Sequence, residues 1–129
     1  MIKQPRYSLT NEGLGRLDEE YIFECPIYGL LVNIPNARLG QSGELKIQKG
    51  YEWDFGSGPA VDTPAVVYAS LGHDVLYDMI GRELLQKKHR KTADVWFRDL
   101  LKRAGMGWFR RSYMYMAVRY GYPLTQVFK

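Results

Sequence analysis

Polar and apolar positions alternate along the first half of the chain in the manner of β-strands. Residues 44–49 alternate strictly, which indicates a half-buried strand. Two more apolar runs cover residues 21–27 and 30–34, and Pro26 places the first of them at a sheet edge or a bulge. Glycine-containing turn signals separate these runs. Residues 20–54 therefore predict a small antiparallel sheet.

The second half of the chain has the period of helices. Thr63 and Pro64 supply a cap and a first-turn proline, which predicts a sparsely charged helix from residue 65 to about 81. A second helix is expected from about residue 88 to 104, with Gly105 as its stop. A third is expected over residues 108–120. Its core-facing stripe would be Phe109, Tyr113, Met116, Ala117 and Tyr120, with the arginines in solvent.

These patterns predict a single α+β domain over residues 1–129. A small N-terminal antiparallel β-sheet is expected to be followed by about three α-helices packed on it. Residues 20–58 would be mainly β and residues 63–121 mainly α.

The composition excludes several other classes of protein. A chain of 129 residues with 46% hydrophobic residues can form one real core, and its longest apolar runs are too short for a membrane span. The first residues lack the apolar stretch of a signal peptide. Cys25 is the single cysteine, which excludes an internal disulfide and a cysteine-based zinc cluster. We expect a buried, inert thiol in a reducing compartment.

Charge is distributed unevenly along the chain. Residues 1–86 carry seven Lys/Arg against twelve Asp/Glu, whereas residues 87–129 carry eleven against two. The basic C-terminal third could face nucleic acid, another anionic polymer or an acidic partner protein, and it could equally pair with the acidic part of its own chain. The third helix interleaves arginines with aromatic residues, a composition that suits bases, phosphates and protein interfaces.

Three polar blocks interrupt the hydrophobic pattern, and each contains a carboxylate. They are residues 53–59 (WDFGSGP), 73–77 (HDVLY) and 90–94 (RKTAD). Polar and charged groups are costly to bury without partners. We therefore expect the three blocks to meet in one site.

The first two blocks place their side chains differently. Asp54 lies where a strand gives way to a glycine-containing loop, a common position for binding groups. A purely structural alternative is that Asp54 bonds loop amides and Ser57 caps the turn. His73 and Tyr77 are four residues apart and share a helix face, whereas Asp74 points about 100° away from His73.

The third block offers an acid beside a buried stripe. Arg90 and Asp94 are four residues apart on the second helix and could form an ion pair. Asp94 directly precedes the apolar residues 95–97. If Asp94 has only a structural role, it forms a salt bridge that stabilises the helix.

Three chemistries could use this set of residues. Asp54, His73 and Asp94 could bind a divalent metal, with zinc preferred for mixed nitrogen and oxygen ligands. Alternatively, Ser57 could be a nucleophile with His73 as its base and Asp74 or Asp94 as the orienting acid. In the third interpretation nothing reacts, and the polar groups form a hydrogen-bonded network between loop and helices.

The order of the blocks resembles a known family. The motifs are G-[aromatic]-x-x-D-x-[small]-S-x-P over residues 50–59, an aliphatic-H-D-x-L-Y block over 71–77, R-x-x-A-D-x-x-F over 90–97, and Y-x-A-V-R over 115–119. This order is similar to an uncharacterised family of small bacteriophage and prophage proteins, domain-of-unknown-function family 1353. The similarity spans roughly residues 45–121. Gly58 departs from the pattern, which has an aliphatic residue before the proline.

The resemblance implies provenance rather than a mechanism. It implies a phage-borne protein made in the cytoplasm of the infected bacterial host, with incorporation into the virion as an alternative. The family's motif positions coincide with Asp54, Ser57, Pro59, His73, Asp74, Tyr77, Arg90, Asp94 and Arg119.

Together these observations lead to one expected function and two alternatives. We expect a metal-dependent hydrolase used in host lysis or cell-wall penetration, with Asp74 as base beside the metal ligands. Tyr77 and Arg90 or Arg119 would position the substrate. One alternative is a non-enzymatic virion or assembly protein that docks on other virion proteins or packaged DNA through its basic, aromatic C-terminal helices. The other is a host-takeover protein that binds nucleic acid.

Overall fold

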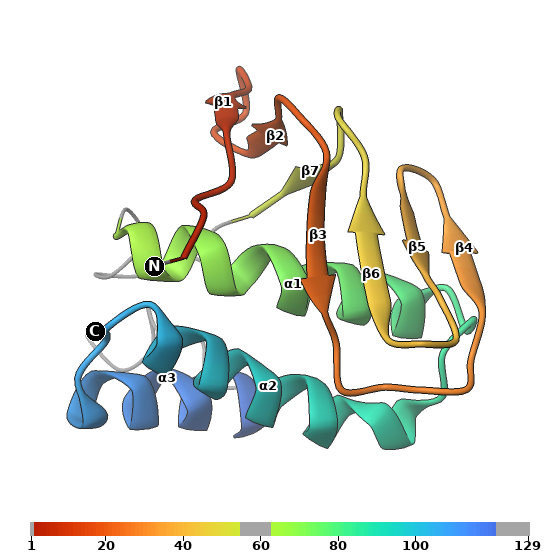
Figure 1. Ribbon diagram of the computed structural model, residues 1–129. Coiled ribbons are helices and arrows are strands. Elements are labelled where there is room, and N and C mark those ends of the chain that lie inside the picture. Colours follow the sequence, from red (N-terminus) through yellow and green to blue (C-terminus); the bar gives the residue numbers. More distant parts are fainter. Residues whose placement is uncertain (1, 55–62, 121–129) are drawn as a thin grey trace.

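The computed structural model describes residues 2–54 and 63–120, and within them the strands precede the helices (Figure 1). The strands are β1 (Tyr7–Leu9), β2 (Gly15–Leu17), β3 (Tyr21–Glu24), β4 (Val32–Ile34), β5 (Ala37–Leu39), β6 (Glu44–Ile47) and β7 (Glu52–Trp53). The helices are α1 (Pro64–Gly81), the short 3₁₀ helix η1 (Lys87–His89), α2 (Arg90–Arg103) and α3 (Trp108–Tyr120). The predicted α+β class is confirmed.

The strands form two antiparallel sheets rather than the single sheet that we expected. One has the order β1-β2-β7 and the other the order β3-β6-β5-β4. The run before Pro26 pairs with β6, and β4 pairs with β5 through a tight turn at Asn36, whose φ is 65°. Just after β3, the Cys25 N–H donates to the Gly43 carbonyl at 2.7 Å, so the segment between β3 and β4 runs beside the turn that precedes β6. Alternation showed which residues face the core but not which strand each would pair with.

The helix boundaries lie close to the prediction because local signals set them. The Thr63 side chain accepts a hydrogen bond from the Val66 N–H, and Pro64 occupies the first turn of α1. Helix α2 ends at Arg103, and Gly105 follows with a φ of 91° that suits a glycine. Helix α2 begins two residues later than predicted, because η1 occupies residues 87–89.

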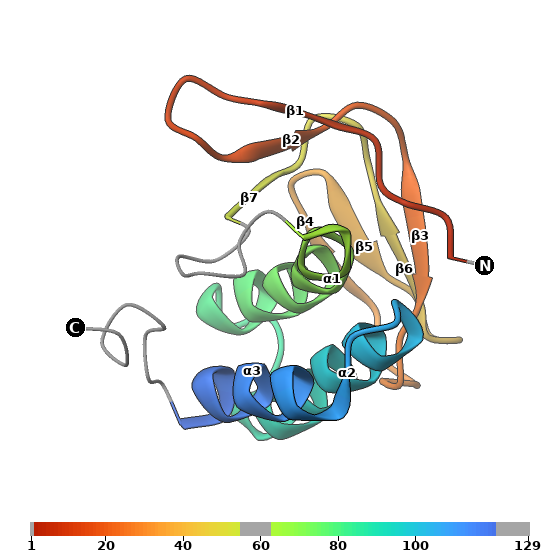
Figure 2. The ribbon, with the colours of Figure 1, turned by 90° about the vertical axis from the view of Figure 1, so that its left-hand side faces the viewer.

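The elements stack in layers, with α1 between the sheets and the pair α2 and α3 (Figures 1 and 2). Twelve of the eighteen residues of α1 are buried. The Trp53 indole N–H donates to Ser70 Oγ at 3.2 Å, which joins β7 to α1. The rings of Phe23 on β3 and Trp96 on α2 lie 5.3 Å apart. The core therefore runs through all three layers.

The core-facing stripe predicted for α3 is wrong at three of its five positions, whereas Tyr113 and Ala117 are partly buried. Phe109, Met116 and Tyr120 are 79%, 51% and 63% exposed, and Met114 is the buried residue of this helix. Val118, one turn after Met114, is also packed against the core. Helix α3 thus uses the opposite face for packing, and its larger apolar side chains point outward.

The structure also describes the Cys25 thiol and the apolar character of the helices. Cys25 is buried, and burial raises the pKa of its thiol to about 11, so the thiol stays protonated at neutral pH. None of the helices in the described part of the chain has the length and apolar character needed to cross a membrane.

Candidate functional site

The site lies along the exposed stripe of α1. Beyond its first turn this helix is almost entirely buried, and the side chains that reach the surface are those of Asp74, Tyr77 and Asp78. Residues three and four apart share one face of a helix. Because α1 lies between β7 and α3 (Figure 2), this face can receive groups from the strand end on one side and from the helices on the other.

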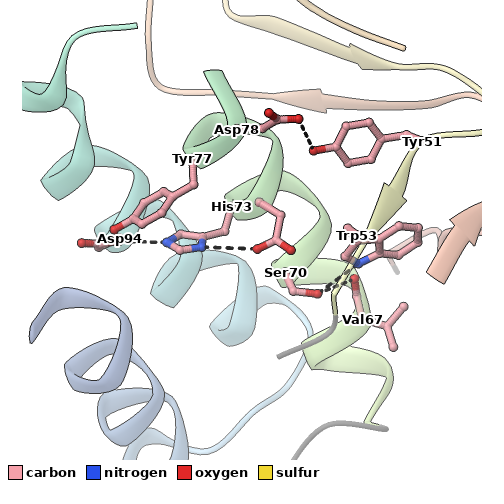
Figure 3. A network of polar contacts seen from close by, with 9 residues as sticks. Tyr51, Trp53, Val67, Ser70, His73, Tyr77, Asp78 and Asp94 are labelled. Atoms are coloured by element: carbon pink, nitrogen blue, oxygen red, sulfur yellow. Dashed lines mark hydrogen bonds and ion pairs between the residues drawn. The ribbon is translucent and has the colours of Figure 1, made fainter. Parts of the chain in front are cut away.

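His73 lies between two carboxylates. Its side chain is 7% exposed, and its Nε2 atom is 2.8 Å from Asp94 Oδ1 on α2 (Figure 3). Its Nδ1 atom is 3.9 Å from Asp74 Oδ1. Burial lowers the pKa of His73, but the two carboxylates outweigh burial and raise this pKa above its ordinary value. The arrangement therefore favours a positively charged imidazolium.

Asp94 is the buried end of this chain of groups. It is 0% exposed, and besides His73 it accepts a hydrogen bond from the Tyr77 hydroxyl at 2.5 Å. Its second oxygen, Oδ2, lies 3.6 Å from Nη1 of Arg119 on α3. A buried carboxylate is tolerated only when such partners compensate its charge. Asp94 thereby ties α2 to both α1 and α3.

Asp74 is the outer end. Its side chain is 33% exposed. Burial raises the pKa of Asp74, His73 opposes that rise, and the charge of Asp54 adds to it. Asp54 itself is exposed and directly follows β7. From the core outward, the row is therefore Asp94, His73 and Asp74. Asp54 lies beside Asp74.

Tyr77 and Arg90 form the border of the site beside α2. The Arg90 guanidinium lies 5.6 Å from the centre of the Tyr77 ring, within cation–π range. Burial and the hydrogen bond to Asp94 raise the pKa of Tyr77 to about 12, so its hydroxyl stays protonated. Helical spacing allowed an ion pair between Arg90 and Asp94, but Arg119 forms it instead, because Asp94 points between the helices rather than along the surface of α2.

The structure therefore brings together most of the predicted site residues. His73 and Tyr77 hydrogen-bond Asp94, Arg119 pairs with Asp94, and Asp74 lies beside His73. Arg90 lies over Tyr77, and Asp54 lies beside Asp74. Ser57 and the rest of its loop, residues 55–62, lie outside the described residues. The roles assigned to these residues stay predictions.

Sequence reasoning missed a second polar cluster on the same face of α1. The Tyr51 hydroxyl donates to Asp78 Oδ2 at 3.2 Å, and Arg82 Nε donates to Asp78 Oδ1 at 2.7 Å (Figure 3 shows the Tyr51 contact). The spacing of four residues between Asp74 and Asp78 was the signal for a shared face. Asp78 has two partners of its own and does not contact His73 through either bond.

A metal would require a rearrangement of the described groups. Within residues 2–54 and 63–120, no three His, Cys, Asp or Glu side chains are placed so that they could hold a metal ion. One nitrogen of His73 bonds Asp94 and the other faces Asp74. Zinc binding by Asp54, His73 and Asp94 would need a neutral His73 that releases Asp94. The zinc site stays a prediction.

Two hollows in the described part of the chain lie away from this site. One, of about 230 Å³, lies between the start of α1 and the turn from α2 to α3. The other, of about 280 Å³, lies between Pro26 and α2. Neither is lined by His73, Asp74 or Asp94.

The fold and the site define an α+β protein with an acid–histidine–acid chain between two helices. This chain belongs to the family described as protein of unknown function (DUF1353), which matches residues 36–118. The match includes every predicted site residue except Arg119, which lies one residue beyond it. Comparison with curated proteins and with solved structures found no match.

Proposed function

We propose that this protein is a hydrolase that acts on an anionic polymer of the bacterial cell wall, with Asp74 as its acid–base group. The observation that carries the proposal is the row of groups from buried Asp94 through His73 to half-exposed Asp74. Burial raises the pKa of Asp74 above its ordinary value, and a carboxyl group with a raised pKa at the surface end of such a row suits proton transfer.

The chemistry follows from the charge state of each group. Asp74 accepts a proton from a water molecule while that water attacks the electrophilic carbon or phosphorus atom of the substrate. Asp74 then gives the proton to the leaving atom, so that the broken bond takes up one water. Charged His73 orients the Asp74 carboxylate, and Asp94 stabilises that charge from the buried side. His73 and Asp94 are thus positioning residues.

The surroundings favour an extended anionic substrate. Arg90 is exposed and Arg119 is 30% exposed, so both cations are accessible beside the carboxylate row. The row ends at Asp74 on the partly exposed stripe of α1, which also carries Tyr77 and Asp78. A polymer lying along this stripe would bring its negative charges near the arginines.

The proposed setting is phage infection. The family resemblance points to a phage-encoded protein that is made in the cytoplasm of the host, where access to the cell wall comes at lysis. Incorporation into the virion would place the same activity at cell-wall penetration.

The first experiment measures release of soluble fragments from purified cell-wall sacculi. We expect the wild-type protein to release soluble fragments. Asp74→Asn should reduce this release at least about a hundredfold, because the proton acceptor is lost. Asp78→Asn is the matched control, since Asp78 lies one turn further along the same face with a side chain that is 31% exposed. Equal rates for both variants, or no release by the wild type, would contradict the proposal.

His73 has a more specific readout. Because charged His73 lowers the pKa of Asp74, His73→Gln should move the acid limb of the pH–rate profile to higher pH. A variant that was merely less stable would lose activity without that movement.

The same preparation tests the two other versions of the hydrolase. Elemental mass spectrometry that found about one zinc per chain, lost in folded Asp54→Ala and His73→Ala proteins, would replace the metal-free reaction by the zinc-dependent one. Loss of activity in Ser57→Ala with retention in Asp74→Asn would favour the serine nucleophile.

A non-enzymatic virion or assembly role is favoured by one observation, the exposed aromatic and basic residues of α3. In that case the protein would be found in purified particles at a fixed ratio, and particles carrying His73→Ala would remain infectious.

A further inference from the structure

The outward face of α3 carries a line of large apolar side chains. Phe109, Met116 and Tyr120 are 79%, 51% and 63% exposed. An α-helix turns about 100° per residue, so these three lie within about 20° of one line along its axis. Trp108, at the start of the helix, is 68% exposed. Exposed apolar side chains gathered on one helix mark an interaction surface.

The charged residues of α3 itself are all basic. Arg110 is exposed and lies to one side of the apolar line, and Lys102, at the end of α2, is exposed beside the turn into α3. No Asp or Glu follows Asp99 in the sequence. The outward face of α3 therefore combines apolar side chains with positive charges, and α3 contains no Asp or Glu that could neutralise those charges.

We propose that the outward face of α3 binds the surface of an anionic lipid bilayer, with Trp108, Phe109, Met116 and Tyr120 at the level of the headgroups. A helix with aromatic and apolar residues on one face and arginines beside it is typical of interfacial binding. Trp and Tyr favour this boundary because their rings have an apolar body and a polar edge. Anionic lipids attract the neighbouring cations.

Other occupants match the face less well. A second copy would bring two sets of cations together at one interface, which opposes association. Single-stranded nucleic acid is held by a basic groove with stacking rings, whereas this line has the aliphatic side chain of Met116 between its aromatic residues Phe109 and Tyr120. Membrane binding is independent of the proposed hydrolase and can be tested without any substrate.

Tryptophan fluorescence gives a direct test. Trp53 and Trp96 are each 3% exposed, so Trp108 is the indole in contact with solvent. With vesicles of phosphatidylglycerol and phosphatidylcholine, we expect a blue shift and protection of Trp108 from iodide. Vesicles of phosphatidylcholine alone should give at least about a tenfold weaker effect. Absence of any shift with anionic vesicles would overturn the proposal.

Sedimentation with the same vesicles tests the two contributions separately. Phe109→Ser with Met116→Ser should weaken binding at least about tenfold through lost apolar contact, and Lys102→Gln with Arg110→Gln about tenfold or more through lost charge. The control is Leu9→Ser with Leu84→Ser, since these residues are 67% and 54% exposed on other elements. An equal loss in the control would overturn the proposal. So would binding of a thymidine oligonucleotide, but not vesicles, by the wild type.

Discussion

Asp94 has the most demanding position of any residue in the site, because a fully buried carboxylate depends on its partners for its charge. His73, Tyr77 and Arg119 reach it from two other helices. Asp94→Asn keeps the size of the side chain but leaves His73 and Arg119 without their counter-charge. We expect a loss of about 3–5 kcal/mol in the free energy of unfolding, measured in urea.

Asp99→Asn is the control for this measurement, since Asp99 is an exposed acid on the same helix. Its effect should stay within about 0.5 kcal/mol. A similarly small effect of Asp94→Asn would mean that the three contacts contribute little net stability.

The charge of His73 makes stability depend on pH. Because its pKa is raised in the folded state, the folded protein binds this proton more tightly than the unfolded chain does. The resulting stabilisation is complete below the unfolded value of about 6.5 and is lost as the pH rises through the higher folded value. In urea unfolding between pH 5.5 and 9, the stability difference between wild type and His73→Gln should therefore shrink with rising pH. A difference that grew with pH would contradict a charged His73.

The sequence predicted the members of the site better than their pairing. Helical spacing predicted that His73 and Tyr77 share a face, and their rings lie 4.2 Å apart. The same spacing predicted that Asp74 would point away from His73, but Asp74 Oδ1 lies 3.9 Å from His73 Nδ1. Arg90 was the nearer basic partner for Asp94 in the sequence, but Arg119 forms the ion pair. That choice depends on how α3 lies against α2, which spacing within one helix does not specify.

At the scale of elements, Gly72 sets the distance between α1 and α2. A Cβ atom on this residue would lie 2.7 and 2.8 Å from two ring carbons of Trp96. Trp96 is 3% exposed and also packs on Phe23, so it has little freedom to move aside. Because Asp94 is two residues before Trp96, the same contact controls its approach to His73.

Gly72→Ala should therefore destabilise the fold by about 1–3 kcal/mol through overpacking. It should also weaken the contact between His73 and Asp94, seen as a lower pKa of His73 in an NMR titration. Gly81→Ala is the matched control, because a Cβ at that end of α1 meets nothing within 4 Å. Equal stability of the two variants would show that the helices adjust without cost.

The helices were more predictable than the sheets for a physical reason. Each helix end is fixed by neighbours in sequence, such as Thr63 and Pro64 at the start of α1. A strand pairs with a partner that can be far away: β7 pairs with β2, and their paired residues Arg16 and Glu52 are 36 positions apart in the sequence. Strands of three residues such as β2 and β5 also give too short a pattern to be distinguished from loops.

At the scale of the whole molecule, sheets and helices share one core, and this predicts a single unfolding transition. Trp53 connects β7 to α1, and Trp96 connects α2 to β3. Helix α1 is too extensively buried to survive in water without the layers that cover it. Separation of the layers should therefore expose both indoles and melt the helices together.

The test uses Trp108→Phe, which removes the exposed indole so that the fluorescence reports the two buried ones. Urea transitions followed by this fluorescence and by far-ultraviolet circular dichroism should coincide in midpoint and slope, as two-state unfolding requires. A fluorescence transition that preceded the loss of helix would show that the sheets can detach from folded helices. It would divide the chain into two units and contradict the single domain. Coincidence would mean that contacts between β3, β7 and the helices also support the geometry around His73.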